Sequence, residues 1–227
     1  MFPRAMNCTP TRPHRISGLL AATTVWKTIG DPIRNVTARL GNFEYRGQRI
    51  TGINNIELIS DRPTDVNIAE IRDVKKRYPN HAVVISLMVE ARREAWHEIL
   101  AKCNDTGADG YELNFGCPHG MSERGMGAAV GQVPDYVQMI TEWVMEKAEF
   151  PVLVKLTPNV TDIRFPARAA KAANADGVAL INTISSLAGV NLDSWAPLPD
   201  VRGKGTHGGY AGPAVKPIAL NMVSQVA

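Results

Sequence analysis

The chain has 227 residues, of which 44% are hydrophobic and 21% are charged, the composition of an ordinary globular protein. It holds 25 Lys and Arg against 22 Asp and Glu, and four of the basic residues precede the first acid, Asp31. The remainder is close to neutral, which argues against nucleic acid as a partner. No apolar run reaches the length of a membrane span, so no membrane association is predicted.

The three cysteines, Cys8, Cys103 and Cys117, lie far apart and form no C-x-x-C pair. This spacing predicts neither a disulfide framework nor an iron–sulfur site on this chain. Such cysteines are typical of a reducing cytoplasm, where we expect the protein. His119 follows Cys117 by two residues, but no second ligand pair exists, so no metal site is expected.

The predicted elements alternate between strands and helices after an irregular, proline-containing segment over residues 1–21. A short buried strand at 23–27 is followed by a hairpin over 43–53 that turns at Arg46-Gly47. Periodicity then predicts, in chain order, a helix over 68–78, a strand over 82–89, a helix over 96–103, a strand over 111–115, a helix over 137–144, a strand over 151–156, a helix over 163–173, a strand over 177–182 and a helical tail from Pro213.

Alternating strands and helices, with nearly continuous apolar strands, predict a parallel sheet covered by helices. A (βα)8 barrel and an open doubly wound sheet both fit this pattern. The fingerprint G-x-G-x-x-G does not follow the first strand, which weakens the doubly wound alternative. Polar residues at several successive strand ends favour the barrel, although only about five or six of its eight strands are recognisable.

A short internal repeat supports the alternation. Ala108-Asp109-Gly110 precedes one predicted strand, and Ala175-Asp176-Gly177 precedes another. In both copies we expect a helix to end at the glycine, which tolerates a left-handed cap.

Candidate functional residues gather where the predicted strands end, and in a parallel α/β fold these ends share one face. Two lysines and three asparagines, without an acid pair, suit an anionic cofactor and a planar polar substrate rather than hydrolysis. The candidates are Lys27, Thr28, Asn55, Glu57, Asn114, Cys117, Lys155, Asn182, Thr183 and Gly212.

Each candidate also has a plainer interpretation. A lone Cys117 is more often a small buried hydrophobe, and an asparagine at a strand end is often a turn former. Lys155 could extend to solvent. The glycines between 116 and 131 could form a simple connector, although a loop of this length is more often a binding loop.

The segment Asn114-Phe115-Gly116-Cys117-Pro118-His119-Gly120-Met121 resembles the active-site loop of dihydropyrimidine dehydrogenases. Further matching motifs follow in order: Trp26-Lys27-Thr28, Asn55-Ile56-Glu57, Lys155-Leu156-Thr157-Pro158-Asn159, Asn182-Thr183 and Gly208-Gly209-Tyr210-Ala211-Gly212. The chain is similar to the FMN-binding catalytic subunit of the bacterial NAD-dependent enzyme.

The resemblance implies an FMN-binding (βα)8 barrel domain over residues 22–227 that reduces uracil or thymine in pyrimidine catabolism. Cys117 would protonate C5 of the pyrimidine. Asn55, Glu57, Asn114, Asn182 and Thr183 would bind the substrate, and Lys27, Thr28, Lys155 and Gly212 would contact FMN. Electrons would come from NAD(P)H through a partner subunit. FAD and iron–sulfur clusters would belong to other domains or subunits, and the intact enzyme would be an oligomer.

The chain also departs from the family. Relative to it, we expect the chain to be cut short at both ends, lacking the first strand and the last two. Gly116 stands where a serine is often found. A dihydroorotate dehydrogenase, a relative with the same barrel, and an inactive truncated fragment remain as alternatives.

Overall fold

The computed structural model describes residues 25–29, 40–45, 48–56, 62–118, 125–198, 200 and 205–227. Over 25–29, 40–45 and 48–51 it describes the backbone and not the side chains. The segment predicted to be irregular, residues 1–21, lies outside this part of the chain, as do Glu57 and His119.

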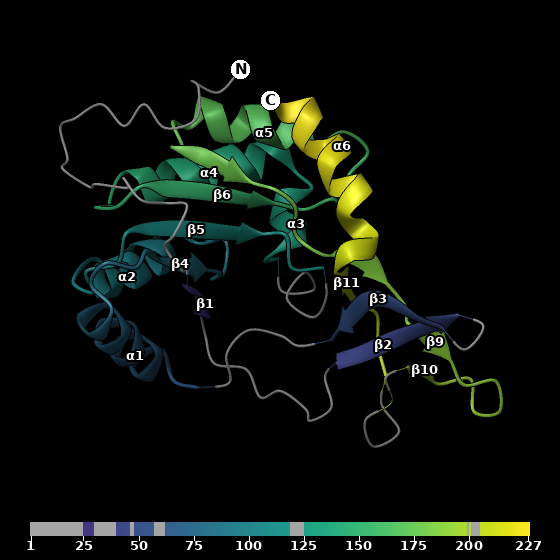
Figure 1. The fold of residues 1–227 in the computed structure, drawn as a ribbon. Coiled ribbons are helices and arrows are strands. Elements are labelled where there is room, and N and C mark those ends of the chain that lie inside the picture. The colour runs from purple at the N-terminus through teal and green to yellow at the C-terminus, as the bar shows by residue number, and fades with distance from the viewer. Residues whose placement is uncertain are drawn as a thin grey trace.

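The described part is built around a parallel sheet whose five strands follow the order β1-β4-β5-β6-β7. Helices alternate with the strands from α1 onward (Figure 1). The predicted α/β architecture with about five parallel strands is confirmed, and these strands do not close into a barrel. The elements are β1 (Val25–Ile29), α1 (Thr64–Arg77), β4 (Val83–Leu87), α2 (Arg93–Asn104), β5 (Gly110–Phe115), α4 (Pro134–Met145), β6 (Val152–Leu156), α5 (Arg164–Ala172) and β7 (Gly177–Ala179).

Alternate residues of the central strands form the hydrophobic core. Ile85, Tyr111 and Val154 are fully buried and belong to the same cluster as apolar residues of the helices. Trp96 of α2 packs edge-to-face against Phe115 of β5, with 5.9 Å between the ring centroids. Each large side chain buried in this way contributes about 1.5–3 kcal/mol.

The positions between these core residues are polar on the same strands. Ser86 of β4 pairs in register with Glu112 of β5, and Asn114 of β5 pairs with Lys155 of β6. Successive residues of a strand point to opposite faces, so these four side chains share the face away from the core. On this second face polar side chains therefore interrupt the predicted apolar runs, beside Val84 and Leu153.

The internal repeat ties neighbouring strands together where they begin. Asp109 Oδ2 accepts a hydrogen bond from the Val83 N–H, and Asp176 Oδ2 accepts one from the Val152 N–H, both at 2.8 Å. In return, the backbone N–H groups of Asp109 and Asp176 donate to the carbonyls of the same two residues. Each aspartate thus fixes the strand that follows it against the strand before.

The predicted glycine caps are wrong. Gly110 and Gly177 are the first residues of β5 and β7, and the left-handed positions fall three residues earlier. Gly107 has φ of 73° and Asn174 has φ of 61°. The chain therefore reverses before the aspartate, which leaves Asp109 and Asp176 extended beside the neighbouring strand.

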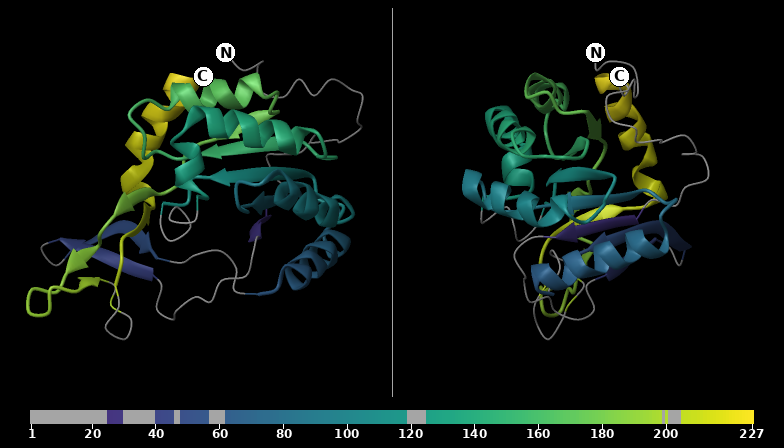
Figure 2. Two further views of the ribbon diagram at one scale, coloured as in Figure 1. Left: turned by 180° about the vertical axis from the view of Figure 1, so that it is seen from behind. Right: turned by 90° about the vertical axis from the view of Figure 1, so that its left-hand side faces the viewer.

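A second, antiparallel sheet lies beyond the carboxyl ends of β5 and β6, where their arrowheads point (Figures 1 and 2). Its order is β2-β3-β11-β8, and it contains the predicted hairpin. Its strands are β2 (Leu40–Tyr45), β3 (Gln48–Asn55), β8 (Ile184–Ser186) and β11 (Gly208–Ala211), with a small hairpin of β9 (Gly189–Val190) and β10 (Pro197–Leu198) beside it.

The remaining elements are α3 (Ala128–Gly131), the 3-10 turn η2 (Pro213–Val215) and α6 (Lys216–Val226). The predicted helical tail corresponds to η2 and α6. Within the described residues, no helix combines the length and the apolar character needed to cross a bilayer.

The two aspartates of the repeat should differ in their contribution to stability. We expect Asp176→Ala to lower the free energy of unfolding by about 1 kcal/mol, because one hydrogen bond to a carboxylate is lost. Asp109→Ala should cost about 2 kcal/mol, because Asp109 also binds the Lys75 ammonium at 2.7 Å. Urea unfolding measures both values.

Asparagine at the same positions is the matched control, since its carbonyl oxygen can still accept the strand N–H. Alanine variants as stable as the wild type would show that the aspartates do not hold the strands together.

Candidate active site

Two asparagines meet at the carboxyl ends of β5 and β7. Asn182 Nδ2 donates a hydrogen bond of 2.8 Å to Asn114 Oδ1. Asn182 lies three residues beyond the last residue of β7, so the predicted strand over 177–182 is too long. Its backbone N–H instead donates to the Leu156 carbonyl at 3.0 Å, which holds it beside the end of β6.

The absence of a side chain at Gly116 permits this contact. A Cβ built there would lie 2.4 Å from both Cβ and Nδ2 of Asn182, closer than real Cβ contacts. The Gly116 N–H also donates to Asn114 Oδ1 at 3.3 Å. Glycine therefore lets the backbone after β5 press directly against the Asn182 side chain.

Asn159 forms hydrogen bonds with residues on both sides of the same cluster along the chain. Its Nδ2 donates to the Thr183 carbonyl at 3.1 Å and to Thr157 Oγ1 at 2.9 Å, and its Oδ1 accepts the Ser185 N–H at 2.8 Å. Thr183 in turn donates its backbone N–H to Asn182 Oδ1 at 2.8 Å. The sequence motif around Lys155 contains Asn159, but no role was predicted for it.

Asn55 belongs to the second sheet, one strand of which contacts Thr183. It is half-buried at the end of β3 and pairs in register with Gly209 of β11. A Cβ on Gly209 would lie 2.1 Å from Thr183 Oγ1, so β11 passes directly against Thr183. Asn55 and Thr183 therefore lie on either side of the same glycine.

Cys117 is nearly buried, with 9% of its surface exposed, three residues beyond Asn114 on the chain. Its carbonyl accepts the Ala128 N–H at 3.0 Å, which attaches it to the start of α3. Gly127 has φ of 58°, and a Cβ there would lie 2.7 Å from the same carbonyl. Both ends of the intervening loop are thus fixed beside the asparagine pair.

Cys103 differs from Cys117 in its surroundings. It lies fully buried on the core side of α2, and desolvation raises the pKa of its thiol to about 12. A thiol of this kind stays protonated and inert at neutral pH. Cys103 is therefore a structural residue.

A buried ion pair occupies the polar face next to these residues. Lys155 Nζ lies 3.6 Å from Glu112 Oε1, and Ser86 Oγ donates to the same oxygen at 2.8 Å. The Glu112 side chain is 4% exposed and that of Lys155 is 31% exposed. Glu112 was not among the predicted site residues, although an acid inside an otherwise apolar strand is a recognisable signal.

For the other predicted site residues, the described part of the chain shows no contact with the asparagine cluster. Lys27 and Thr28 lie in the middle of β1 rather than at its end, and their side chains lie outside the described part. In register, Lys27 pairs with Ile85 and Thr28 with Ser86. Gly212 follows β11 with φ of 105°, a conformation that favours glycine, and no contact joins it to the asparagines in the described part.

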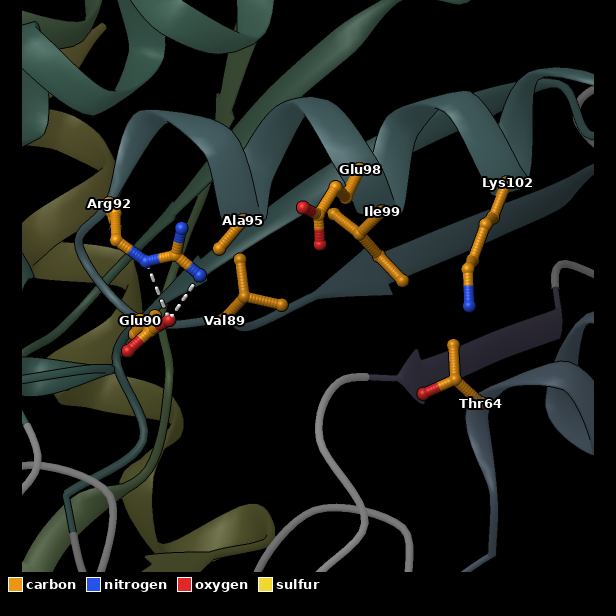
Figure 3. A pocket seen from close by; sticks show the side chains of 8 residues that line it. All are labelled: Thr64, Val89, Glu90, Arg92, Ala95, Glu98, Ile99 and Lys102. Atoms are coloured by element: carbon orange, nitrogen blue, oxygen red, sulfur yellow. Dashed lines mark hydrogen bonds and ion pairs between the residues drawn. The ribbon is translucent and has the colours of Figure 1, made fainter.

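A small pocket of about 120 Å³ lies elsewhere, between the start of α1 and α2 (Figure 3). Its charged groups are of both signs and are partly engaged, with Arg92 bound to Glu90 at 2.8 Å and Lys102 to Asp65 at 3.1 Å. None of the predicted site residues lines it. We therefore place the site at the asparagine cluster.

Comparison with known proteins identifies the family of the chain. The family model described as dihydroorotate dehydrogenase matches residues 42–227, which is most of the chain. The chain belongs to the dihydroorotate dehydrogenase family. Proteins of this family have the TIM-barrel fold, are oxidoreductases and depend on flavin.

The predicted resemblance to dihydropyrimidine dehydrogenases is confirmed. The chain is 42% identical to the chloroplastic dihydropyrimidine dehydrogenase (NADP(+)) of Arabidopsis thaliana, over 88% of this chain and 47% of the relative. It is 38% identical to the NAD-dependent dihydropyrimidine dehydrogenase subunit PreA of Escherichia coli K12, over 89% of this chain and 49% of the relative.

A relative with a different named activity also matches. The chain is 39% identical to the catalytic subunit of dihydroorotate dehydrogenase B (NAD(+)) of Pyrococcus abyssi, over 70% of this chain and 49% of the relative. The chain thus spans about half the length of the curated relatives it matches.

Gly116→Ala should displace the Asn182 side chain. The added methyl group would collide with Asn182, so we expect the hydrogen bond to Asn114 to break and stability to fall by about 1–3 kcal/mol. Side-chain amide resonances of ¹⁵N-labelled protein, assigned with Asn182→Asp, report the bond. We expect the Asn182 signals to move toward the positions of an exposed amide.

Gly125→Ala is the control, because its Cβ meets no atom within 4 Å although φ is 70°. It should cost stability through backbone strain and leave the Asn182 signals in place. Unchanged signals in Gly116→Ala would mean that glycine is not needed for the asparagine contact.

Proposed function

We propose that this chain carries the FMN site of a dehydrogenase that reduces uracil and thymine to 5,6-dihydropyrimidines, a step of pyrimidine catabolism. The observation that carries the proposal is the hydrogen-bonded pair of Asn114 and Asn182 beside the nearly buried Cys117. The identity to dihydropyrimidine dehydrogenases of a plant and a bacterium supports it.

The amide cluster suits the edge of a pyrimidine ring, which alternates carbonyl acceptors with N–H donors. An asparagine side chain offers both a donor and an acceptor. Within the described residues, the two side-chain hydrogen bonds of Asn114 use its carbonyl oxygen, so we assign its Nδ2 as the donor to a substrate carbonyl. Asn55 and Thr183 complete the proposed substrate site, together with Glu57, which lies outside the described residues.

The face of the sheet that carries Lys155 offers a cation and hydrogen-bond donors suited to FMN. The Lys155 ammonium is one-third exposed and shares its face of the sheet with Ser86, Glu112 and Asn114. Lys155, Lys27, Thr28 and Gly212 are the residues we assign to the cofactor. FMN, when bound, supplies the hydride that reaches C6 of the pyrimidine.

Cys117 is the proposed general acid, which delivers its proton to C5 of the substrate. Its near-complete burial limits the access of bulk water to the thiol, and its carbonyl is fixed by the Ala128 N–H. A well-placed acid of this kind contributes about 10²–10⁴-fold to the rate.

Electrons would reach the chain from NAD(P)H through a partner subunit, as the match to a subunit of the Escherichia coli enzyme suggests. FAD and iron–sulfur clusters would belong to that partner or to other domains, and the assembled enzyme would be an oligomer. Cysteines that form no C-x-x-C pair suit the cytoplasm as its location.

Dihydroorotate dehydrogenase is the alternative activity, favoured by the family match and by the Pyrococcus abyssi relative. Its substrate carries a carboxylate, which needs a cation, whereas uracil and thymine are neutral. Competition between uracil and orotate for the flavin-loaded protein separates the two. Tighter binding of orotate would favour the alternative.

Cys117→Ala should abolish proton transfer while the cofactor stays bound. In the flavin-loaded, chemically reduced protein, we expect uracil to reoxidise the flavin at least 100-fold more slowly than in the wild type, because C5 has no proton donor. Anaerobic stopped-flow absorbance measures this single turnover and needs no partner subunit.

Cys103→Ala is the matched control, since it removes the other described thiol away from the site, and its rate should stay close to that of the wild type. Wild-type turnover in Cys117→Ala would exclude Cys117 as the acid.

A further inference from the structure

Glu112 is a carboxylate enclosed by the sheet, and its burial needs a reason. Moving a carboxylate out of water costs several kcal/mol unless its partners compensate. Among the described side chains, Glu112 receives a hydrogen bond from Ser86 and forms an ion pair with Lys155. An apolar side chain at this position would cost less, so packing alone does not account for an acid here.

The strand register shows what the acid does to its partner. Lys155 of β6 is paired in register with Asn114 of β5. Its ammonium nevertheless lies next to Glu112, which precedes Asn114 by two residues on β5. Ser86, on the far side, binds the same oxygen of Glu112 and limits its movement. The ion pair thus joins the ammonium to the residue two positions before its register partner.

We propose that Glu112 is a positioning residue, which holds the Lys155 ammonium at a fixed place on this face of the sheet. The proposal rests on the proposed function, in which Lys155 contacts FMN. Ser86 acts through Glu112 and not on Lys155 directly. Lys155 is one-third exposed, so it can remain solvated when its partner is removed.

The reactivity of Lys155 toward trace acetic anhydride at pH 8 tests this without any cofactor. An amine held against a carboxylate moves little and presents its nitrogen poorly to the reagent, so it is acylated slowly. In Glu112→Gln, which keeps the side-chain shape but removes the charge, we expect acylation of Lys155 to be several-fold faster, because the ion pair no longer holds the amine. In Ser86→Ala the increase should be about two- to threefold, because the carboxylate remains but is less fixed.

Peptide mass spectrometry compares Lys155 with the exposed Lys147 and with the partly buried Lys75, which is paired with Asp109. Loosening of the whole fold would also speed acylation of Lys75, whereas loss of positioning changes Lys155 alone. Glu98→Gln, which removes an exposed acid from α2, should change none of them. If Glu112→Gln does not fold, Ser86→Ala decides the question.

An unchanged Lys155 ratio in the folded variants overturns the proposal. A second arm adds FMN to the wild-type protein. Protection of Lys155 by FMN supports the proposed cofactor contact, and lack of protection removes it without affecting the result obtained with Glu112→Gln. The two hypotheses therefore fail on different measurements.

Discussion

The register of the parallel strands is the constraint on which the site depends. Successive strand residues face opposite ways, so a slip of one residue would turn Glu112 and Asn114 toward the helices and Tyr111 toward the polar face. Asp109 and Asp176 resist such a slip by binding the first residue of the preceding strand, and the Tyr111 N–H adds a bond of 2.8 Å to the Pro151 carbonyl. Hydrogen bonds where the strands begin thus fix the positions of the candidate site residues near the carboxyl ends of the strands.

The two faces of the parallel sheet differ in the polarity of their side chains. The face under α2, α4 and α5 is apolar and supplies most of the buried surface. The opposite face carries an ion pair, a hydroxyl and an amide on three neighbouring strands, with few apolar residues between them. Charges on such a face interact more strongly than in water, which suits the recognition of a polar ligand. The core and the proposed binding site therefore use different residues of the same strands.

Periodicity predicted the long elements because each carries several turns or pleats of pattern, as α1 and β6 do. The short strands β8 to β10 have two or three residues each, too few to show a period. The convergence of Asn114 and Asn182 followed from their places after parallel strands. Glu112 was missed because its partner lies on another strand, and the sequence does not show which residues face each other across a sheet. The glycine caps were misplaced for a similar reason, since the neighbouring strand fixes the role of Asp109 and Asp176.

The small hairpin of β9 and β10 affects the tryptophan fluorescence of the protein. Trp195 in its turn is 77% exposed, whereas Trp96 in the core is 1% exposed and lies against Phe115. An indole in water emits at longer wavelengths than one in a hydrocarbon environment, and a dissolved quencher such as iodide reaches only the former. The fluorescence of the four tryptophans therefore includes a shielded contribution from Trp96 and an accessible one from Trp195, which iodide quenching distinguishes.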